Sequence, residues 1–568
     1  ELREVPGLTV IVYDQTCAAE KRRRRKRGTF PDPAKRVFIN DSVCEGCGDC
    51  SDKSNCVSVK PLETELGRKR QIDQSNCNKD FSCVNGFCPS FVSVHGGAVR
   101  KARRPQLKVV QDDPFASLPL PTVRPLDEAY GILVTGIGGT GVITVGALIG
   151  MAAHLEGKGC TVLDFTGLAQ KNGAVMSHIR LAPGPEHSAV VRIPAGGANL
   201  LLGCDMVVAA APLALSRLEH GVSRAVINAA LTPTAEFVTN GDVDFESHAI
   251  RRALRETIGD KGVTFIEGTR LATALMGDSI ATNLFMLGYA YQSGLIPLGQ
   301  EAIERAIELN GAAVESSKRA FSFGRLAAHD LAQVEALMMP EQVPAKALAN
   351  LSERIALREA FLVRYQDHRY AERYRSLVNR VAAVEKARMP SSTALAEAVA
   401  ISLFKLMAYK DEYEVARLYT EEHFLTKLNS QFDGDFKLQF HLAPPLIAKR
   451  DPTTGELKKR AFGPWMLHVF RALAKLRRLR GTRFDIFGYT EERRSERQMI
   501  IDYEQLTTYV IDRLTVKNHA IAVELAKLPQ TVRGFGHVRE RNLKIAKAAE
   551  EGLRVTFANP ETMSLAGE

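Results

Sequence analysis

Cysteine spacing is the feature that most restricts how this chain can fold. Seven of its ten cysteines lie between Cys44 and Cys88, and three of them form the run Cys44-x-x-Cys47-x-x-Cys50. Three thiolates in such a run can hold three irons of a 4Fe–4S cube, and a distant Cys-Pro, here Cys88-Pro89, supplies the fourth ligand. We therefore expect this segment to fold as tight loops around an iron–sulfur cluster.

The second half of the segment repeats the spacing with a carboxylate at its centre. It reads Cys77-x-x-Asp80-x-x-Cys83, and the whole pattern resembles a bacterial two-cluster ferredoxin, in which each half lends its last cysteine to the other cluster. This register predicts two ligand sets: Cys44, Cys47, Cys50 and Cys88 for the first cluster, and Cys56, Cys77, Asp80 and Cys83 for the second. Because oxygen holds iron less firmly than thiolate does, the second site is predicted to bind a 3Fe–4S or a labile 4Fe–4S cluster.

Zinc ligation, disulfide bonding and simple packing are the alternatives to iron–sulfur ligation for these residues. Structural zinc favours paired C-x-x-C motifs over a triplet with scattered single cysteines. Disulfides require a secreted protein, and no signal peptide is visible. Asp80 is equally explained as a solvated loop acid, and Cys56, Cys77 and Cys83 as packing residues without a second cluster.

The composition indicates several domains in a reducing compartment. A length of 568 residues exceeds one domain, and its hydrophobic content of 45% is ordinary for a globular protein. A net charge of +10 attracts acidic partners such as ferredoxins, nucleotides or nucleic acid. The basic run Lys21–Arg27 has no nucleic-acid-binding module beside it, so we interpret it as a contact for a local anion or an acidic partner. We expect a cytoplasmic protein that binds no nucleic acid.

One apolar stretch has the length of a membrane span. No Asp, Glu, Lys or Arg occurs from Gly131 to Leu155. Seven glycines interrupt this stretch, however, and they favour a buried strand followed by a helix that opens at a glycine turn. We therefore expect no membrane span.

The chain divides into segments of different composition. They are residues 1–40 with a short strand at Leu8–Tyr13, the cysteine module 41–100, a proline-rich linker 101–127, an α/β region 128–325 and a mainly helical region 340–568. Alternating strands and helices in the α/β region predict a mostly parallel, doubly wound sheet. Its candidate strands are Ile132–Thr135, Thr161–Phe165, His178–Leu181, Met206–Ala209, Ala225–Ile227 and Val263–Ile266.

The α/β region opens with a glycine turn between a strand and a helix. Its glycines allow a tight turn and close approach of a phosphate to the helix N-terminus, and they are Gly136, Gly138, Gly139 and Gly141. A dinucleotide site also needs an acid about twenty residues further on, and Asp164 lies somewhat late on a suitable strand. A phosphate cradle, an NAD site and a turn that serves only packing all stay open.

These features, in this order, are similar to those of the 2-oxoacid:ferredoxin oxidoreductases. The glycine turn and the segment Asp164-Phe165-Thr166-Gly167-Leu168-Ala169-Gln170-Lys171-Asn172-Gly173 resemble the gamma, or catalytic, domain of that family. Tyr13-Asp14-Gln15-Thr16-Cys17 resembles the end of its thiamine-diphosphate-binding domain. Through Arg533-Gly534-Phe535-Gly536-His537, the chain resembles the C-terminal half of the fused bacterial indolepyruvate ferredoxin oxidoreductases.

The resemblance implies oxidative decarboxylation of an aryl pyruvate, such as indolepyruvate, to an acyl-CoA. Thiamine diphosphate with Mg would start the reaction, coenzyme A would accept the acyl group, and electrons would pass through the iron–sulfur clusters to ferredoxin. It also implies that Gln170, Lys171 and Asn172 face the active site as catalytic residues and that the glycine turn cradles a phosphate.

The sequence lacks a thiamine-diphosphate motif. We therefore expect a fragment that is inactive alone, needs the missing N-terminal thiamine-binding half and forms a homo-oligomer. Two alternatives are kept: an NAD(P)-linked iron–sulfur electron-transfer subunit, and a non-catalytic assembly subunit that carries clusters.

The helical region contains two similar tyrosine-rich stretches, Tyr365–Tyr374 and Tyr409–Tyr419. At helical spacing they predict a packing face with satisfied polar tips rather than a substrate site. We interpret the region as scaffold or dimer contact and expect the lone Trp465 in its core.

Overall fold

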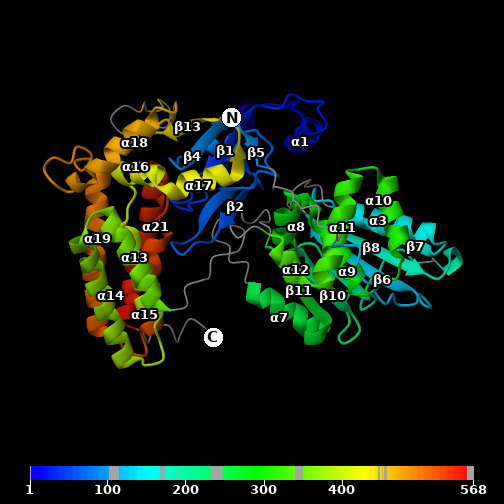
Figure 1. Cartoon of the computed structure of the whole chain (residues 1–568). Coiled ribbons are helices and arrows are strands. Elements are labelled where there is room, and N and C mark those ends of the chain that lie inside the picture. Colours follow the sequence, from blue (N-terminus) through cyan, green and yellow to red (C-terminus); the bar gives the residue numbers. More distant parts are fainter. Residues whose placement is uncertain are drawn as a thin grey trace. The chain divides into compact units, whose positions relative to one another are not determined.

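The structure is a computed structural model that describes residues 2–100, 114–166, 173–187, 190–231, 247–338, 350–444, 448, 450, 452 and 457–559. The chain forms two compact units (Figure 1). One combines Glu1–Ala98 with Leu348–Glu568, and the other is Val99–Ala347. The cysteine module and the C-terminal helices therefore belong to one unit, although they lie at opposite ends of the sequence. Among the described helices, none is long and apolar enough to cross a membrane.

A six-stranded sheet with the order β11-β10-β9-β6-β8-β7 forms the centre of the second unit. Its strands are β6 (Tyr130–Ile137), β7 (Gly159–Thr166), β8 (Ala174–Ala182), β9 (Leu200–Gly203), β10 (Arg224–Asn228) and β11 (Val263–Ile266). The four strands from β11 to β6 are parallel, and β8 is antiparallel to both of its neighbours.

Helices cover both faces of this sheet (Figure 1). Successive strand residues face opposite sides, so Ile132 and Val134 belong to one core and Leu133 to the other. The first core is closed by α3 (Val142–Leu155), α8 (Gly268–Met276), α9 (Thr282–Gln292), α10 (Gln300–Asn310), α11 (Val314–His329) and α12 (Leu331–Ala336). The second is closed by α4 (Met206–Ala209), α5 (Pro212–Leu215) and α7 (Ser247–Ile258). The predicted doubly wound α/β domain is confirmed.

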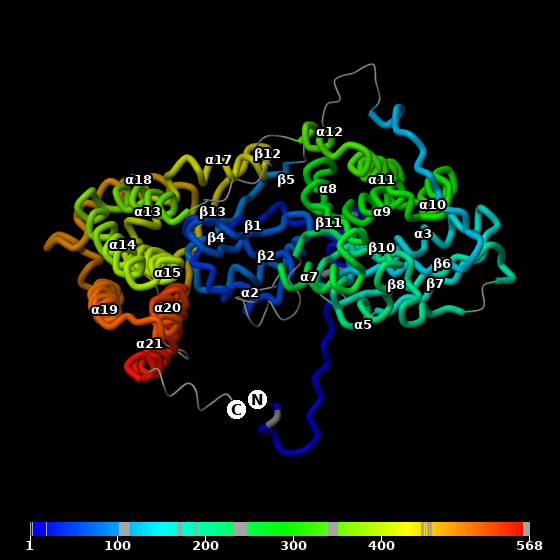
Figure 2. The backbone as a smooth tube through the Cα atoms, turned by 90° about the horizontal axis from the view of Figure 1, so that it is seen from below, coloured from blue at the N-terminus to red at the C-terminus, as the bar shows by residue number. Residues whose placement is uncertain are grey.

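The first unit has a four-stranded antiparallel sheet with strands from both ends of the chain. Its order is β1-β4-β13-β14, from β1 (Lys35–Ile39), β4 (Phe91–His95), β13 (Lys437–Leu442) and β14 (Arg460–Phe462). Figure 2 shows β1, β4 and β13 side by side, and Phe440 of β13 is in register with Val92 of β4. The C-terminal region thus extends the sheet that flanks the cysteines. The cysteine module also contains α2 (Asp49–Ser54), the hairpin of β2 (Val59–Leu62) and β3 (Lys69–Ile72), and the 3-10 turn Ser82–Asn85.

The C-terminal region is mainly helical, as predicted. Its helices are α13 (Leu351–Tyr365), α14 (His368–Arg388), α15 (Ala394–Met407), α16 (Glu412–Thr420), α17 (Glu422–Gln431), α18 (Met466–Lys475), α19 (Glu491–Arg513), α20 (His519–Lys527) and α21 (Gly536–Ala558). Tyr365 is buried, and its hydroxyl donates to the carbonyl of Tyr409 at 2.9 Å. Asp367 caps α14 by accepting from the Tyr370 amide at 2.8 Å. The tyrosine-rich stretches therefore serve helix packing and capping.

Three local expectations are wrong. Met206–Ala209 is helix α4 rather than a strand, because the Asp205 carboxylate caps it by accepting from the Val208 amide at 3.0 Å. The strand of this part of the sheet is β9, just before it. Leu8–Tyr13 is exposed without regular structure, and no described strand pairs with it. Trp465 is 55% exposed rather than part of the core.

Candidate iron–sulfur site and glycine turn

The four cysteines assigned to the first cluster are neighbours inside the first unit. Cys44, Cys50 and Cys88 are buried in one apolar core, and Cys47 is partly buried. Burial raises the pKa of the Cys50 thiol well above its ordinary value, and the charges of Cys44, Cys47 and Cys88 raise it further. Cys44, Cys50 and Cys88 thus share one core, and Cys47 is close enough to act electrostatically on the Cys50 thiol.

The surroundings of these thiols fit an iron–sulfur cluster. Burial raises the pKa of Cys88 to about 11, with a further contribution from Cys44. Several thiolates in a low-dielectric interior repel one another, and a cationic iron core is the partner that stabilises them. The Gly46 amide donates to the Cys44 sulfur at 3.3 Å, and the Ser90 hydroxyl lies 3.0 Å from the Cys88 sulfur. Contacts of this kind orient and tune cluster ligands.

Gly46 lets its cysteine loop approach the β2–β3 hairpin, and Gly86 lets the segment before Cys88 approach α2. Gly46 has a φ of +68°, and a Cβ there would lie 2.2 Å from the Arg68 carbonyl oxygen. A Cβ on Gly86 would lie 2.9 Å from the Cys50 Cα.

No three His, Cys, Asp or Glu side chains in the described part of the chain converge on a single metal ion. A four-iron cube separates its ligands more widely, because each thiolate binds a different corner.

The cysteines assigned to the second cluster border the same apolar core: Cys83 is buried in it, and Cys56 and Cys77 pack against it. Burial raises the pKa of Cys83, and the charges of Cys56, Cys77 and Asp80 add to that effect. Asp80 itself is exposed, and its carboxylate accepts from the Ser82 amide at 3.3 Å and from the Ser82 hydroxyl at 3.1 Å. Asp80 is thus near the Cys77 and Cys83 thiols, and it also stabilises its own loop. Ligation by Asp80 stays a prediction.

The basic run lies in helix α1 (Ala18–Lys26) and contacts the loop that carries Cys77. Arg22 donates to the Asn76 side-chain oxygen at 2.7 Å, and Arg25 donates to the Asn78 carbonyl. At least these two arginines therefore bind the chain's own loop, beside the second group of thiols.

Sequence reasoning missed residues of the C-terminal region that contact the first group of cysteine loops. Lys410 donates to the Cys44 carbonyl at 3.2 Å, and the Tyr419 hydroxyl donates to the Pro89 carbonyl at 2.6 Å. Lys459 donates to the Gly86 carbonyl and to the Cys88 carbonyl, the latter at 3.4 Å. These contacts span more than 300 residues of sequence, so no local pattern predicts them.

In the second unit the glycine turn joins β6 to α3, as predicted. Gly139 and Gly141 have φ values of +82° and +97°, which side chains rarely adopt. A Cβ on Gly136 would lie 2.6 Å from Val142 Cγ2, so this glycine permits close packing of strand and helix. The Gly138 amide donates to the Gly173 carbonyl at 2.9 Å, and this hydrogen bond occupies it. Gly139 and Gly141 are therefore the better candidates for approach to a phosphate.

Strand order separates Asp164 from the glycine turn. β8 lies between β6 and β7, so Asp164 on β7 is two strand spacings from β6, or about 10 Å. In the dinucleotide-binding fold, the strand with the ribose-binding acid is the direct neighbour of the strand before the glycines. This arrangement disfavours NAD binding. The predicted catalytic residues Gln170, Lys171 and Asn172 lie outside the described residues.

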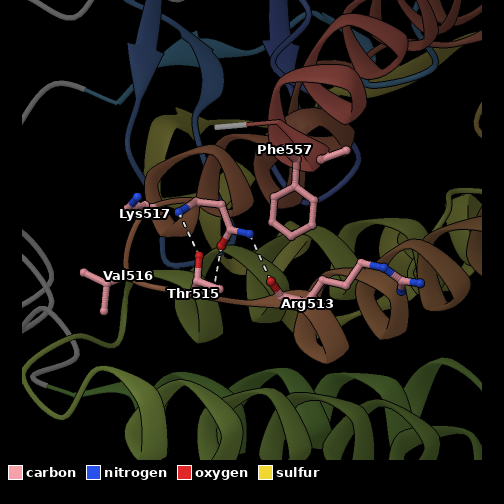
Figure 3. A pocket seen from close by; sticks show the side chains of 7 residues that line it. Arg513, Thr515, Val516, Lys517 and Phe557 are labelled. Atoms are coloured by element: carbon pink, nitrogen blue, oxygen red, sulfur yellow. Dashed lines mark hydrogen bonds between the residues drawn. The ribbon is translucent and has the colours of Figure 1, made fainter. Parts of the chain in front are cut away.

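A hollow of about 630 Å³ opens in the C-terminal region, and Figure 3 shows side chains that line it. Arg513, Thr515, Lys517 and Phe557 line it together with Asn518. The Asn518 amide group donates to the Arg513 carbonyl at 3.0 Å, and its oxygen accepts from the Thr515 amide at 2.7 Å. The polar groups of Asn518 thus stabilise the loop that lines the hollow. They are used for loop structure, so the hollow does not resemble a reactive site.

Residues 131–327 match the family described as "Pyruvate ferredoxin/flavodoxin oxidoreductase", and residues 351–552 match a "Family of unknown function (DUF6537)". Over residues 131–327 the chain is similar to the 2-oxoacid:ferredoxin oxidoreductases, which confirms the predicted resemblance. The chain is also similar to indolepyruvate oxidoreductase subunit IorB of Pyrococcus horikoshii, with 29% identity over 207 residues. The aligned part is 36% of this chain and 98% of that subunit.

Other relatives cover a similar share of the chain. Indolepyruvate oxidoreductase subunit IorB of Thermococcus kodakarensis is 27% identical over 36% of this chain and 98% of its own length. Among solved structures, the pyruvate oxidoreductase subunit PORC of Thermotoga maritima is 19% identical, with a TM-score of 0.26, and covers 35% of this chain and 96% of that subunit. The part shared with these relatives is about a third of this chain, which has further residues beyond it.

Proposed function

We propose that this chain carries electrons and provides the gamma domain in an oxidoreductase that converts an aryl pyruvate, such as indolepyruvate, to its acyl-CoA. The observation that carries this proposal is the presence of two groups of potential cluster ligands in a chain that also has a gamma-type domain. Indolepyruvate is the substrate named for the IorB relatives, and it enters here as a proposal. The cytoplasm is the proposed location.

The first unit would hold the iron–sulfur clusters. Cys44, Cys47, Cys50 and Cys88 would bind the first, and Cys56, Cys77, Cys83 and Asp80 the second. Bound clusters accept and release single electrons, which suits transfer to ferredoxin. Because Cys44, Cys50 and Cys88 are buried, the first cluster would be shielded from water. Asp80 is exposed, so the second cluster would lie nearer to the protein surface.

The second unit would cover the reacting carbon. Gly139 and Gly141 would admit a phosphate of coenzyme A at the N-terminus of α3, and Gln170, Lys171 and Asn172 would contact the substrate. Thiamine diphosphate with Mg, bound by another part of the enzyme, would supply the electron sink for decarboxylation. The enzyme would act as a larger assembly of this chain with a thiamine-binding part.

The test combines the purified chain with a thiamine-binding part, thiamine diphosphate, Mg, coenzyme A, indolepyruvate and a viologen dye. We expect dye reduction only when both protein parts are present, and loss of it in Cys47→Ser. Lys171→Ala should lower kcat/KM without changing the iron content. Dye reduction by NAD(P)H and this chain alone would instead support the NAD(P)-linked electron-transfer subunit. No substrate-dependent reduction by the complete assembly would leave the assembly subunit as the better description.

A further inference from the structure

The turn Arg533–His537, which precedes and begins helix α21, lies against the first group of cysteines. Gly534 has a φ of +102°, and a Cβ there would lie 2.7 Å from Val538 Cγ1 and 3.4 Å from the Cys47 Cβ. Phe535 packs against the apolar core that contains Cys44, Cys50 and Cys88. The turn thus contributes to the surroundings of thiols that lie almost 490 residues earlier in the chain.

The same turn contacts the residue before Cys88. Gly536 has a φ of +49°, and its Cβ would lie 2.7 Å from Phe87 Cε1. The His537 ring lies 4.9 Å from the Phe87 ring, centroid to centroid. On its other side, the Phe87 amide donates to the Asp49 carboxylate at 2.6 Å. Phe87 is therefore fixed between helix α2 and the Arg533–His537 turn.

A hollow of about 470 Å³ opens beside this contact. Phe87, His537 and Lys459 line it, together with Lys53 and His441. Lys459 also donates to the carbonyls of Gly86 and Cys88. The side chains of Phe87 and His537 thus form part of the wall of this hollow, and they separate it from the segment before Cys88.

We propose that the C-terminal region is the cover of the first iron–sulfur site and that its Arg533–His537 turn excludes water from the cluster at Cys47 and Cys88. This inference rests on the proposed function, because it requires a cluster on those cysteines. It also gives a role to the region that matches a family of unknown function and to the turn that follows α20. Solvent exposure and hydrogen bonds to the ligand loops are the levers by which a protein sets a cluster's potential and lability.

The glycine requirement supplies a sharp test. Gly534→Ala adds a Cβ where φ is positive and Val538 leaves no room, so the turn must move away from Cys47. His537→Ala shortens the wall at Phe87 without straining the backbone. Gly552→Ala is the matched control, because this residue of α21 has an ordinary φ and no atom within 4 Å of its new Cβ.

The full chain, reconstituted anaerobically with iron and sulfide, is exposed to an iron chelator while cluster absorbance is followed. We expect iron release at least tenfold faster in Gly534→Ala and His537→Ala than in the wild type, and unchanged release in Gly552→Ala. EPR-monitored redox titration should show a higher potential for the first cluster in both variants, because water stabilises the added negative charge of the reduced state.

Wild-type release rates and potentials in both turn variants would overturn the covering role. If the wild type takes up no iron–sulfur cluster at all, the proposed function fails before the covering role is tested, so the two failures are distinguishable. Loss of the cluster in Gly534→Ala with an unchanged circular dichroism spectrum also supports the cover. If that variant unfolds, His537→Ala alone decides.

Discussion

Replacement of Lys410 by Met should destabilise the first unit through a single buried carboxylate. Lys410 contacts the Glu45 carboxylate and donates to the Cys44 carbonyl at 3.2 Å. The side chains of Lys410 and Glu45 are 9% and 11% exposed. Water can therefore replace little of the interaction that the Glu45 carboxylate loses with Lys410. Glu45 would keep its charge in a buried place with its nearest partner gone, which is the costly way to break an ion pair.

The pKa of Glu45 gives the magnitude. Burial raises this pKa, but the charges of Lys410, Lys69 and Lys405 lower it more, from 4.5 to about 2. At about 1.36 kcal/mol for each tenfold change in proton affinity, the net stabilisation of the carboxylate is about 3 kcal/mol. Lys69 and Lys405 stay beside Glu45 in the variant, so we expect Lys410→Met to lower the free energy of unfolding by about 2 kcal/mol.

Urea unfolding followed by far-UV circular dichroism measures this loss. Glu45→Gln in the Lys410→Met background should restore most of the stability, because it removes the unpaired charge. The folded pKa of Glu45 lies below its ordinary value, so its contribution is present above pH 4.5 and is lost as the pH falls toward 2. Lys547→Met, at an exposed position of α21, is the control. A loss below about 0.5 kcal/mol, or no recovery in the double variant, would refute the reasoning.

Three further outcomes follow from the packing and the ligand register. Gly288→Ala should cost about 3 kcal/mol in thermal or urea unfolding, because its Cβ would lie 2.0 Å from the Phe321 carbonyl oxygen between α9 and α11; a cost near zero would contradict this close contact. Asp80→Cys should slow iron loss from the second site to a chelator, since thiolate holds iron more firmly than carboxylate; faster loss than in the wild type would count against ligation. Tyr365→Phe should cost about 1 kcal/mol by leaving the Tyr409 carbonyl without its hydroxyl donor, and an unchanged unfolding midpoint would show that the bond contributes nothing.

The predictions made from the sequence rest on local patterns, and iron–sulfur ligation stays one of them. The triplet spacing Cys44-x-x-Cys47-x-x-Cys50 places three thiols on one tight loop whatever the rest of the chain does. Likewise, the glycine turn after an apolar run predicts β6 and α3, because positive φ angles at Gly139 and Gly141 require glycine. In the α/β region, apolar strand-like segments alternate with helical segments along the chain. This alternation sufficed to predict the fold class.

The missed features depend on residues far apart in sequence. The pairing of β13 with β4 and the contact of Lys410 with Cys44 join the two ends of the chain, and no local periodicity records such pairs. Met206–Ala209 has the composition of a strand, but one capping carboxylate at Asp205 makes it a helix. For Asp80, the spacing indicates a cluster ligand, whereas the hydrogen bonds to Ser82 indicate a loop acid. The rate of iron loss from Asp80→Cys distinguishes these two roles.

Iron and sulfide quantitation with EPR of the reduced, anaerobically reconstituted chain tests the central claim most directly. Two clusters predict about seven to eight irons per chain and two sets of signals, one lost in Cys47→Ser and the other in Cys77→Ser. About four irons, with signals unaffected by Cys77→Ser, would remove the second cluster. Zinc in place of iron, or no sulfide, would contradict the account as a whole.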